Sequence, residues 1–461
     1  MIGKGRSGVA VDGRDGDVDG GVTYYLPLTV DAYSWKANIS IFLSPDATTK
    51  IHVALAVVQS IPLLGICERG DLTVILEAVL STLFLLSGLA LAHTYFLYPI
   101  TLQLWTRFVS DRGAATSEDR PSVALIIAAY NEEEVIAEKI ENSLQLEYPE
   151  NELDIVVFSD ASDDRTDEIV EEYEEQGVSL IQIEGRVGKT ECQNRVADLV
   201  EEDILVFSDA NSMYEPDAIS ELVSRFAPGV GCVVGELRYR EASDVGGESV
   251  YWRYESWIKR LESRFYSLVT GNGSIYAVKV DSYVPQPADA ISDFTEPLSI
   301  LRNGERVVYA PGAVAWEETE SSTADELQRR VRIVTRSWNS IVRFRDLLEP
   351  LRNTRIAYQL WSHKMLRWLS PVLLFGVLVA NVGLVLVMPL VIFELLLAGQ
   401  LLFYLFATVG WVTDRLDIED PILTHVPFYF LQANYGMILG FVEFMRGNNI
   451  VTWETSDRAK E

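Results

Sequence analysis

The segment SVALIIAAYNE, residues 122–132, decides the fold. Its first part, Ser122 to Ala128, is a short apolar run bounded by polar residues, which is typical of a strand buried on both faces. Asn131 and Glu132 follow at once, so polar side chains stand just past the carboxyl end of the predicted strand. In a sheet of parallel strands, that end borders the crevice in which ligands bind.

Similar short runs recur downstream, and helix-like stretches separate them. They are Asp154 to Ser159, Ser179 to Ile183, Ile204 to Ser208 and Cys232 to Gly235. Alternation of this kind predicts an α/β fold, with a Rossmann-like and mostly parallel sheet that helices cover on both faces. We place this domain at residues 121–322.

Hydrophobic segments flank the α/β domain. Residues 1–70 are expected to form a disordered or marginally hydrophobic extension. Ala78 to Thr106 contains no Asp, Glu, Lys or Arg and two arginines follow it, which predicts a transmembrane helix over 72–106 and a cytosolic domain after it. Residues 367–445 contain three more uncharged runs, expected to be three transmembrane or interfacial helices, and 446–461 form a polar tail. The sequence leaves open whether one of these helices re-enters, and so on which side the tail lies.

A basic amphipathic helix is predicted over 323–346. Its apolar residues recur at steps of four and three, and arginines lie opposite them. The apolar stripe comprises Leu327, Val331, Val334, Trp338 and Ile341, and the arginines are Arg329, Arg330, Arg332, Arg336, Arg343 and Arg345. We expect this helix to lie on an anionic membrane surface; the alternative is an ordinary surface helix of the domain.

The chain is strongly acidic, with 67 acidic and 38 basic residues and a net charge of −29. The acidic residues are spread through the soluble region, which favours a solvated surface adapted to a salt-loaded, halophilic cytoplasm over a block that binds a basic partner. The cysteines Cys67, Cys192 and Cys232 have no paired or metal-binding spacing, so neither a disulfide nor a zinc site is expected.

Polar residues and glycines follow four predicted strands in turn. They are Asn131 with Glu132, Asp160 with Asp163, Gly188 with Lys189, and Asp209 with Asn211. Each alone could be a helix cap or turn residue, but their order favours one shared site. Residues 185–190, GRVGKT, resemble the end of a nucleotide-binding P-loop, but Ile183 stands where that motif needs its first glycine, which excludes it.

The stretch from Pro121 to Trp338 resembles the family-2 glycosyltransferases of GT-A fold, which include cellulose, hyaluronan and poly-N-acetylglucosamine synthases and their archaeal relatives. The matching segments are the strand-end residues above, Gly271-Asn272-Gly273, Ser292-Asp293, and Val308 to Pro311. Membrane helices on both sides match the synthase-like branch.

The resemblance implies a role for each strand-end residue. Asn131, Glu132, Asp160, Asp163, Lys189, Asp209 and Arg332 would bind a nucleotide-sugar donor, with Asp160 holding its uracil or ribose. Asp209 and Asn211 would ligate Mg²⁺ or Mn²⁺ at the donor diphosphate. Asn211 stands where the family has a second aspartate, so weaker metal binding is expected.

The resemblance also names the catalytic base and the acceptor side. Asp293 would accept the proton of the acceptor hydroxyl, and Gly271, Asn272 and Gly273 would line the acceptor side. The alternative for Asp293 is an N-cap of a helix that begins at Phe294. Ser292 stands where the family has an acid. The Gln-x-x-Arg-Trp motif of processive members has no tryptophan here, which counts against polymer synthesis.

The expected function is that of a multi-pass enzyme of the cell membrane with a cytosolic catalytic domain. It would be an inverting glycosyltransferase that moves a sugar, from a UDP-sugar donor, to a glycan or polyprenyl-lipid acceptor for cell-surface polysaccharide or glycoconjugate synthesis. Membrane lipids are expected partners and nucleic acid is not. The alternative is a non-catalytic scaffold that binds nucleotide sugars within a glycan-assembly complex.

Overall fold

The computed structural model describes residues 72–108, 120–240, 247–318, 323–416, 418 and 421–448. The predicted extension 1–70 and the tail beyond residue 448 lie outside the described residues. The chain divides into two compact units, Met1–Ala78 and Val79–Glu461, and the contacts given below all lie within the second unit.

A single mixed sheet of eight strands lies at the centre of the described domain, in the order β3-β2-β1-β4-β7-β6-β8-β5. The strands are β1 (Val123–Ala129), β2 (Leu153–Ser159), β3 (Val178–Gln182), β4 (Ile204–Asp209), β5 (Met213–Tyr214), β6 (Val230–Arg240), β7 (Ile275–Lys279) and β8 (Arg306–Glu318). Four neighbouring pairs are parallel and three are antiparallel, the latter being β4 with β7, β7 with β6, and β5 with β8.

The register of β1 aligns the ends of its neighbours. Ala129 pairs with Ser159 of β2, and Ala128 pairs with Asp209 of β4. The antiparallel strand β7 begins beside the end of β4, where Ile275 pairs with Ser208. The loops after β1, β2 and β4 and the loop before β7 therefore meet at one edge of the sheet.

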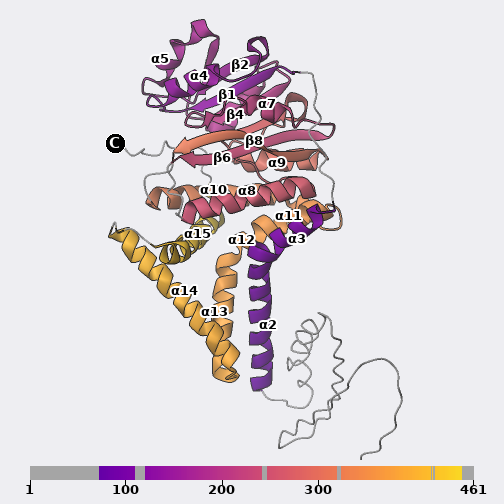
Figure 1. Ribbon diagram of the computed structural model, residues 1–461, viewed down its shortest axis with the longest axis vertical. Helices are drawn as coiled ribbons and strands as arrows, with labels where there is room; N and C mark the ends of the chain where they lie inside the picture. The colour runs from indigo at the N-terminus through magenta and orange to yellow at the C-terminus, as the bar shows by residue number, and fades with distance from the viewer. Residues whose placement is uncertain are drawn as a thin grey trace, which may run out of the picture. The chain divides into compact units, whose positions relative to one another are not determined.

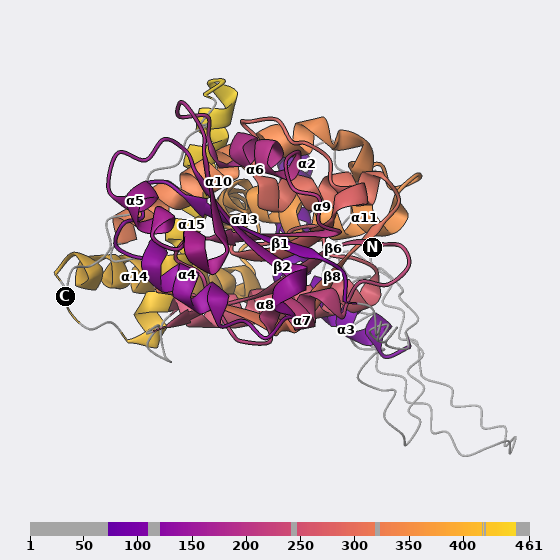
Figure 2. The same cartoon turned by 90° about the horizontal axis from the view of Figure 1, so that it is seen from above.

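Helices cover both faces of the sheet (Figure 1). The α-helices of the described residues are α2 (Leu72–Ala92), α3 (Tyr98–Thr106), α4 (Ile136–Leu144), α5 (Thr166–Glu171), α6 (Lys189–Ala197), α7 (Ala218–Val223), α8 (Gly247–Phe265), α9 (Ser292–Arg302), α10 (Thr323–Arg343), α11 (Thr354–Leu360), α12 (Leu366–Trp368), α13 (Ser370–Val387), α14 (Val391–Arg415) and α15 (Ile422–Met445), of which α2, α13 and α14 extend away from the sheet. Figure 2 shows α4, α5 and α7 on one side of the strands and α6 and α9 on the other.

The core is divided between the two faces because successive side chains of a strand point to opposite sides. In β1, Ala124 and Ile126 belong to the cluster under α6 and α9, whereas Leu125 and Ile127 belong to the cluster under α4, α5 and α7. Both clusters are fully apolar along β1, which explains its uninterrupted hydrophobic sequence. Each such buried side chain contributes roughly 1.5–3 kcal/mol.

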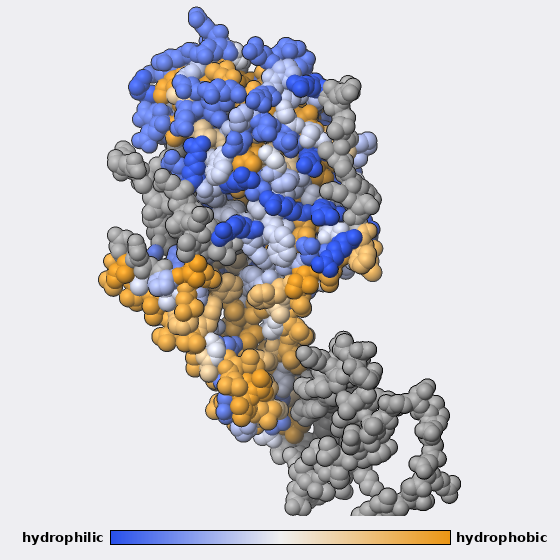
Figure 3. All heavy atoms as spheres, in the orientation of Figure 1, coloured by the Kyte–Doolittle hydropathy of each residue, from blue (hydrophilic) through white to orange (hydrophobic). Residues whose placement is uncertain are grey.

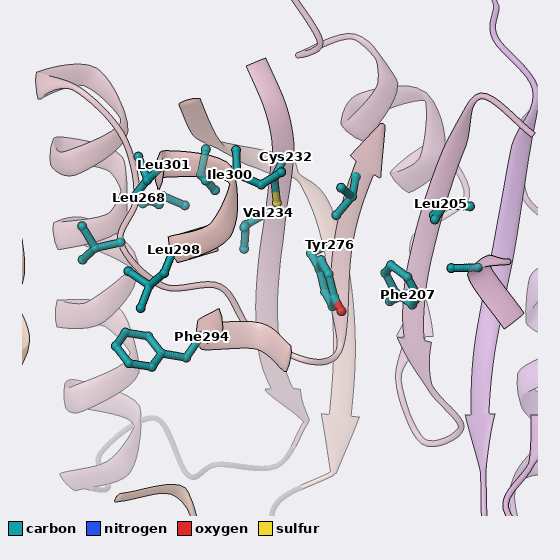
Figure 4. Packing of buried hydrophobic residues seen from close by; sticks show 14 of the residues in the cluster. Leu205, Phe207, Cys232, Val234, Leu268, Tyr276, Phe294, Leu298, Ile300 and Leu301 are labelled. Carbon is teal, nitrogen blue, oxygen red and sulfur yellow. The ribbon is translucent and has the colours of Figure 1, made fainter. Parts of the chain in front are cut away.

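Figure 4 shows how α9 packs on the sheet. Ile300 lies beside Cys232 of β6, Leu298 projects from α9 on the side of Phe294, and these residues and Val234 belong to one buried cluster. On the neighbouring strands, the rings of Phe207 and Tyr276 stack with centroids 4.9 Å apart. This packing fixes the start of α9 near the aligned strand ends.

The predicted α/β fold is confirmed, and the five predicted strands correspond to β1, β2, β3, β4 and β6. The sheet is more mixed than the sequence suggested, because β7 runs antiparallel between β4 and β6. No strand was predicted over Ile275–Lys279, since five residues after a glycine-rich segment give a weak periodic signal.

Three described helices are long and apolar enough to cross a membrane: Leu72–Thr106, Ser370–Val387 and Val391–Arg415. In Figure 3, hydrophobic side chains gather over α13 and α14, and hydrophilic ones cover the upper part of the α/β domain. Helix α2 contacts α13 closely, since a Cβ added to Gly376 would lie 2.9 Å from Ser87 Oγ. The number of spans in 367–445 stays a prediction.

Helix α15 covers part of the apolar stripe of α10. A Cβ at Gly440 would lie 2.7 Å from Val334 Cβ, and the Thr335 hydroxyl donates to the Gly440 carbonyl over 3.1 Å. Arginines of α10 also have partners within the protein, since Arg330 pairs with Glu326 and Arg343 with Asp289. The predicted contact of this helix with an anionic membrane surface stays a prediction.

Gly440→Ala should destabilise the protein. Its methyl group would collide with Val334 and force α15 away from α10, at a cost of about 1–3 kcal/mol. Gly399→Ala in α14 is the matched control, because nothing lies within 4 Å of a Cβ there. Thermal unfolding of both variants in detergent should show a lower Tm for the first only; equal Tm values would contradict the close packing of α10 and α15.

Glu296 in α9 is a buried acid with few hydrogen bonds to compensate a negative charge, and this leads to a second prediction. Its side chain is 1% exposed, Oε2 accepts a hydrogen bond from Gln286 over 3.1 Å, and Oε1 has no partner in the described structure. Burial raises the pKa of Glu296 from 4.5 to about 8. Between these values the folded state keeps a proton that the unfolded state releases, so folding stability falls as pH rises.

Glu296→Gln should therefore be more stable than the parent protein, by a margin that grows between about pH 5 and pH 8. The expected gain is on the order of 4 kcal/mol, because Gln cannot ionise. The exposed Glu171→Gln is the control and should show no such trend. A Tm difference that stays constant across this pH range would show that Glu296 ionises normally in the folded state.

Candidate functional site

Asp160, directly after β2, anchors the loop before α6. Its carboxylate is fully buried and accepts hydrogen bonds from the backbone N–H groups of Val187 (2.8 Å) and Gly188 (3.0 Å). The Arg186 guanidinium lies 3.9 Å away. Gly188 has φ +92°, a left-handed conformation that favours glycine. Asp160 therefore holds the amides at the start of α6 in place, and its predicted donor contact would use the same side chain.

The loops after β1 and β2 are joined by a reciprocal pair. Asn131 Nδ2 donates to Asp163 Oδ1 over 2.5 Å, and the Asp163 backbone N–H donates to Asn131 Oδ1 over 2.9 Å. Glu132 takes part through its backbone N–H, which donates to the Thr166 hydroxyl over 2.8 Å. The structure thus brings three predicted donor-binding residues onto one rigid pair of loops.

A stacked pair that the sequence analysis missed flanks these loops. The Arg186 guanidinium carbon lies 2.9 Å from the ring centroid of Tyr130. Tyr130 follows β1 and Arg186 precedes α6, so the pair spans the crevice above β1 and β2. Arginine and tyrosine planes of this kind form a flat, cationic surface.

Lys189 and Asp209 form an ion pair at the centre of the aligned strand ends. Lys189 is the first residue of α6, Asp209 is the last residue of β4, and both side chains are partly exposed, at 19% and 31%. Gly273 lies against this pair, because a Cβ there would be 3.3 Å from Lys189 Nζ and 3.7 Å from Asp209 Oδ2. Predicted donor, metal and acceptor residues therefore meet at one point.

The predicted acceptor segment is held between β6 and α9. Asn272 Nδ2 donates to the Gly235 carbonyl over 2.9 Å, and the Gly271 N–H donates to the Asp293 carbonyl over 2.7 Å. A Cβ at Gly271 would lie only 3.0 Å from that carbonyl oxygen. Only glycine fits this approach without displacing the backbone of Asp293.

Asp293 is the second residue of α9, and the N-cap position belongs to Ile291. The alternative prediction, an N-cap of a helix from Phe294, is therefore wrong. Asp293 Oδ1 is buried and has no hydrogen-bond partner within the described residues. Burial raises the pKa of Asp293, and the nearby cations Lys189, Lys364 and Arg336 oppose that shift. A carboxylate in this setting can accept a proton from a bound hydroxyl.

Two arginines of α10 fix the segment that leads into Asp293. Arg336 is buried and donates to the Ala290 carbonyl, and Arg343 binds Asp289 through two contacts of 2.8 and 2.6 Å. Sequence reasoning listed both only as basic residues of an amphipathic helix. Arg332, the predicted diphosphate contact, lies on the same helix and near Arg336, and its role stays a prediction.

The predicted metal ligands offer one carboxylate, from Asp209, and one amide, from Asn211. Within the described ranges there is no group of three His, Cys, Asp or Glu side chains that could enclose a metal ion. This donor set fits a hard divalent cation such as Mg²⁺ or Mn²⁺, which takes few protein oxygens and completes its shell with phosphates and water. It does not fit zinc.

Comparison with known proteins agrees with this geometry. The family model "Glycosyltransferase like family 2" matches residues 121–335. The poly-beta-1,6-N-acetyl-D-glucosamine synthase of Staphylococcus epidermidis is 25% identical over 278 residues, 56% of this chain and 66% of the synthase, so the match spans just under two thirds of that relative. The probable glycosyltransferase YdaM of Bacillus subtilis is 24% identical over 340 residues, 69% of this chain and 79% of that protein.

The fold is also found among solved structures. The mannosyltransferase PcManGT from Pyrobaculum calidifontis, solved in complex with GDP-Man and Mn²⁺, has a TM-score of 0.61 at 19% identity. The likeness covers 81% of this chain and 99% of that chain. Together, the family match and the shared fold show that residues 121–335 form a glycosyltransferase family 2 domain of the GT-A fold.

Proposed function

We propose that this chain is a membrane-bound, inverting glycosyltransferase. It transfers a sugar from a nucleotide-sugar donor, a UDP-sugar, to a glycan or a lipid-linked acceptor during synthesis of a cell-surface polysaccharide or glycoconjugate. The catalytic domain faces the cytosol and the apolar helices hold it at the cell membrane. The alternative of a non-catalytic scaffold is disfavoured, because a scaffold would have no need of a carboxylate beside the donor site with one buried oxygen that lacks a partner within the described residues.

Asp293 carries this proposal. Its Oδ1 atom lacks a partner in the described structure although it is buried, and the Lys189–Asp209 pair is close enough to influence its charge. An unsatisfied buried acceptor costs folding free energy, so its retention points to a bound group that completes it. The acceptor hydroxyl is that group, since it can donate to Oδ1 before transfer.

The reaction needs three contributions from the chain. Asp160 and the Asn131–Asp163 pair fix the loops around the nucleotide, and Lys189 turns from Asp209 to the donor diphosphate. Asp293 takes the proton of the acceptor hydroxyl as that oxygen bonds to the anomeric carbon and the bond to the nucleotide diphosphate breaks. Displacement from the opposite face inverts the anomeric centre.

Asp209 and Asn211 would hold Mg²⁺ or Mn²⁺ against the donor diphosphate. When bound, this cation neutralises the charge that develops on the leaving nucleotide. The solved mannosyltransferase holds Mn²⁺ together with its nucleotide sugar, which supports a divalent cation here. That protein binds GDP-Man, so the donor panel described below includes GDP-linked as well as UDP-linked sugars.

The acceptor is proposed to reach Asp293 from the membrane side. Phe294 packs edge-on against Trp368 with ring centroids 5.9 Å apart, and Trp368 lies just before the apolar helix α13. The residue after Asp293 therefore contacts, in space, the segment that leads into an apolar helix. Adaptation of the acidic surface to a high-salt cytoplasm likewise remains part of this proposal.

A panel of radiolabelled nucleotide sugars tests the function directly. Purified membranes in high salt would receive UDP- and GDP-linked sugars, with and without Mn²⁺. Product that extracts into organic solvent indicates a lipid acceptor, and product retained on paper indicates a polymer. Absence of transfer from every donor, with donor binding intact, would favour the scaffold alternative.

Asp293→Asn should lower the rate of transfer by at least about a hundredfold while donor binding survives, because it removes the base but no proposed donor contact. Initial rates and nucleotide-sugar binding would be measured on the same preparation. Asp281→Asn, at an exposed position after β7, is the matched control and should retain full activity. An activity loss below about tenfold in Asp293→Asn would exclude Asp293 as the base.

A further inference from the structure

A buried carboxylate lies next to the proposed cation site and belongs to none of the predicted functional residues. Glu317, near the end of β8, is 8% exposed. Its Oε1 atom accepts hydrogen bonds from the hydroxyls of Ser212 and Ser274, each over 2.5 Å. A charged group in so buried a position requires compensation, because burying it without partners is costly.

The two serines connect Glu317 to both halves of the site. Ser212 directly follows Asn211, a proposed metal ligand, and Ser274 directly follows Gly273, which lies against Asp209. Glu317 therefore joins the loop after β4 to the loop before β7. Tyr214 reinforces the same link from β5, because its hydroxyl donates to the Ser274 carbonyl over 2.9 Å.

The charged side chains near Glu317 show which groups can compensate its negative charge. Asp209 is close enough that its charge, together with burial, raises the pKa of Glu317. Lys139 is fully buried, donates to the Ser212 carbonyl over 2.5 Å and lies 3.8 Å from the ring centroid of Tyr214. Burial lowers the pKa of Lys139 to about 7, while Asp209 and Glu317 oppose the shift. Lys189 pairs with Asp209, and the charge of Arg329 opposes the rise in the pKa of Glu317. Once Lys189 turns to the donor diphosphate, as proposed above, Lys139 and Arg329 are left to balance the two carboxylates.

The two hydroxyl contacts do not by themselves require a charge at position 317. A glutamine could accept both hydrogen bonds with its amide oxygen and would avoid the cost of burying an ion. The charge is explained if a cation binds at Asp209, whose side chain is 31% exposed, on the side that is open to solvent. The open side is where Lys189 meets Asp209 and where the donor diphosphate is proposed to lie.

We propose that Glu317 is a positioning residue that supplies the second negative charge of the divalent-cation site. It takes over the charge that Asn211 lacks, and it holds the loops of Asp209 and Gly273 in register through Ser212 and Ser274. Glu317 acts from behind these loops, and Asp209 and Asn211 are the groups that touch the cation. This inference rests on the proposed function, since it assumes a divalent cation at Asp209.

Glu317→Gln tests the charge while keeping the hydrogen bonds. Mn²⁺ binding would be followed by electron paramagnetic resonance on the full-length protein, with UDP and GDP supplied in parallel. We expect an affinity for Mn²⁺ about 10–100-fold weaker than in the parent protein, as is typical when a group behind a metal ligand is lost. The matched control is Glu318→Gln, at the adjacent exposed position, which should bind Mn²⁺ normally.

Restoring a carboxylate elsewhere in the site distinguishes an electrostatic role of Glu317 from a purely structural role. The double variant Asn211→Asp with Glu317→Gln should recover most of the lost Mn²⁺ affinity, because a second charge returns beside Asp209. A purely structural Glu317 would not be rescued in this way. Ser212→Ala with Ser274→Ala supplies an independent reading, should Glu317→Gln fail to fold. This double serine variant keeps the charge of Glu317 but removes both hydrogen bonds to its carboxylate, and it should also weaken Mn²⁺ binding.

Two outcomes would overturn the inference, and they are distinguishable. If the parent protein binds Mn²⁺ and Glu317→Gln binds it equally well, Glu317 has no part in the cation site, whereas the proposed function stands. If the parent protein binds no Mn²⁺ with either nucleotide and transfers sugar without it, the proposed cation site is wrong, and this inference falls with it. A Tm measured for every variant confirms that each comparison is made between folded proteins.

Discussion

The parallel hydrogen-bonded register of β1 with β2 and β4 is the constraint on which the rest of the site depends. Because Ala129 lies beside Ser159 and Ala128 beside Asp209, the polar residues that follow each strand emerge at the same edge. A shift of one residue would turn the alternating core side chains of β1 toward the wrong face. The two apolar clusters that sandwich this strand therefore also fix the positions of the chemical groups.

Charged side chains hold the loops around the candidate site in place by binding groups on distant segments. Asp160 binds backbone amides before α6, Arg343 binds Asp289 before α9, and Glu317 binds hydroxyls on two loops. Each contact joins segments that are far apart in sequence. Asp160 and Glu317 are buried, so the low local dielectric strengthens their hydrogen bonds, whereas Arg343 is exposed. Lys189 and Asp209 differ from these, because both are partly exposed and their pairing is with each other.

The sequence could predict the residues that lie close to a strand in the chain, because the end of an apolar run locates them. Asp160, Lys189 and Asp209 belong to this group, and the structure brings the last two into contact. Contacts between distant segments give no such local signal. Lys139, Ser212, Ser274 and Glu317 lie on four separate segments, and only the folded sheet brings them together. The antiparallel strand β7, which carries Ser274 to the site, was missed for the same reason.

The arrangement of helices connects the apolar helix α15 to the polar candidate site through α10. Helix α10 has its apolar stripe against α15, while its Arg336 and Arg343 reach the segment before Asp293. One helix thus contacts both a hydrophobic helix and the segment that leads into α9, the helix that carries the proposed base. Any displacement of α15 would be transmitted through the close contact at Gly440 to these arginines, because packed helices shift as rigid bodies. The same packing that stabilises the chain therefore sets the position of Asp293 relative to Lys189 and Asp209.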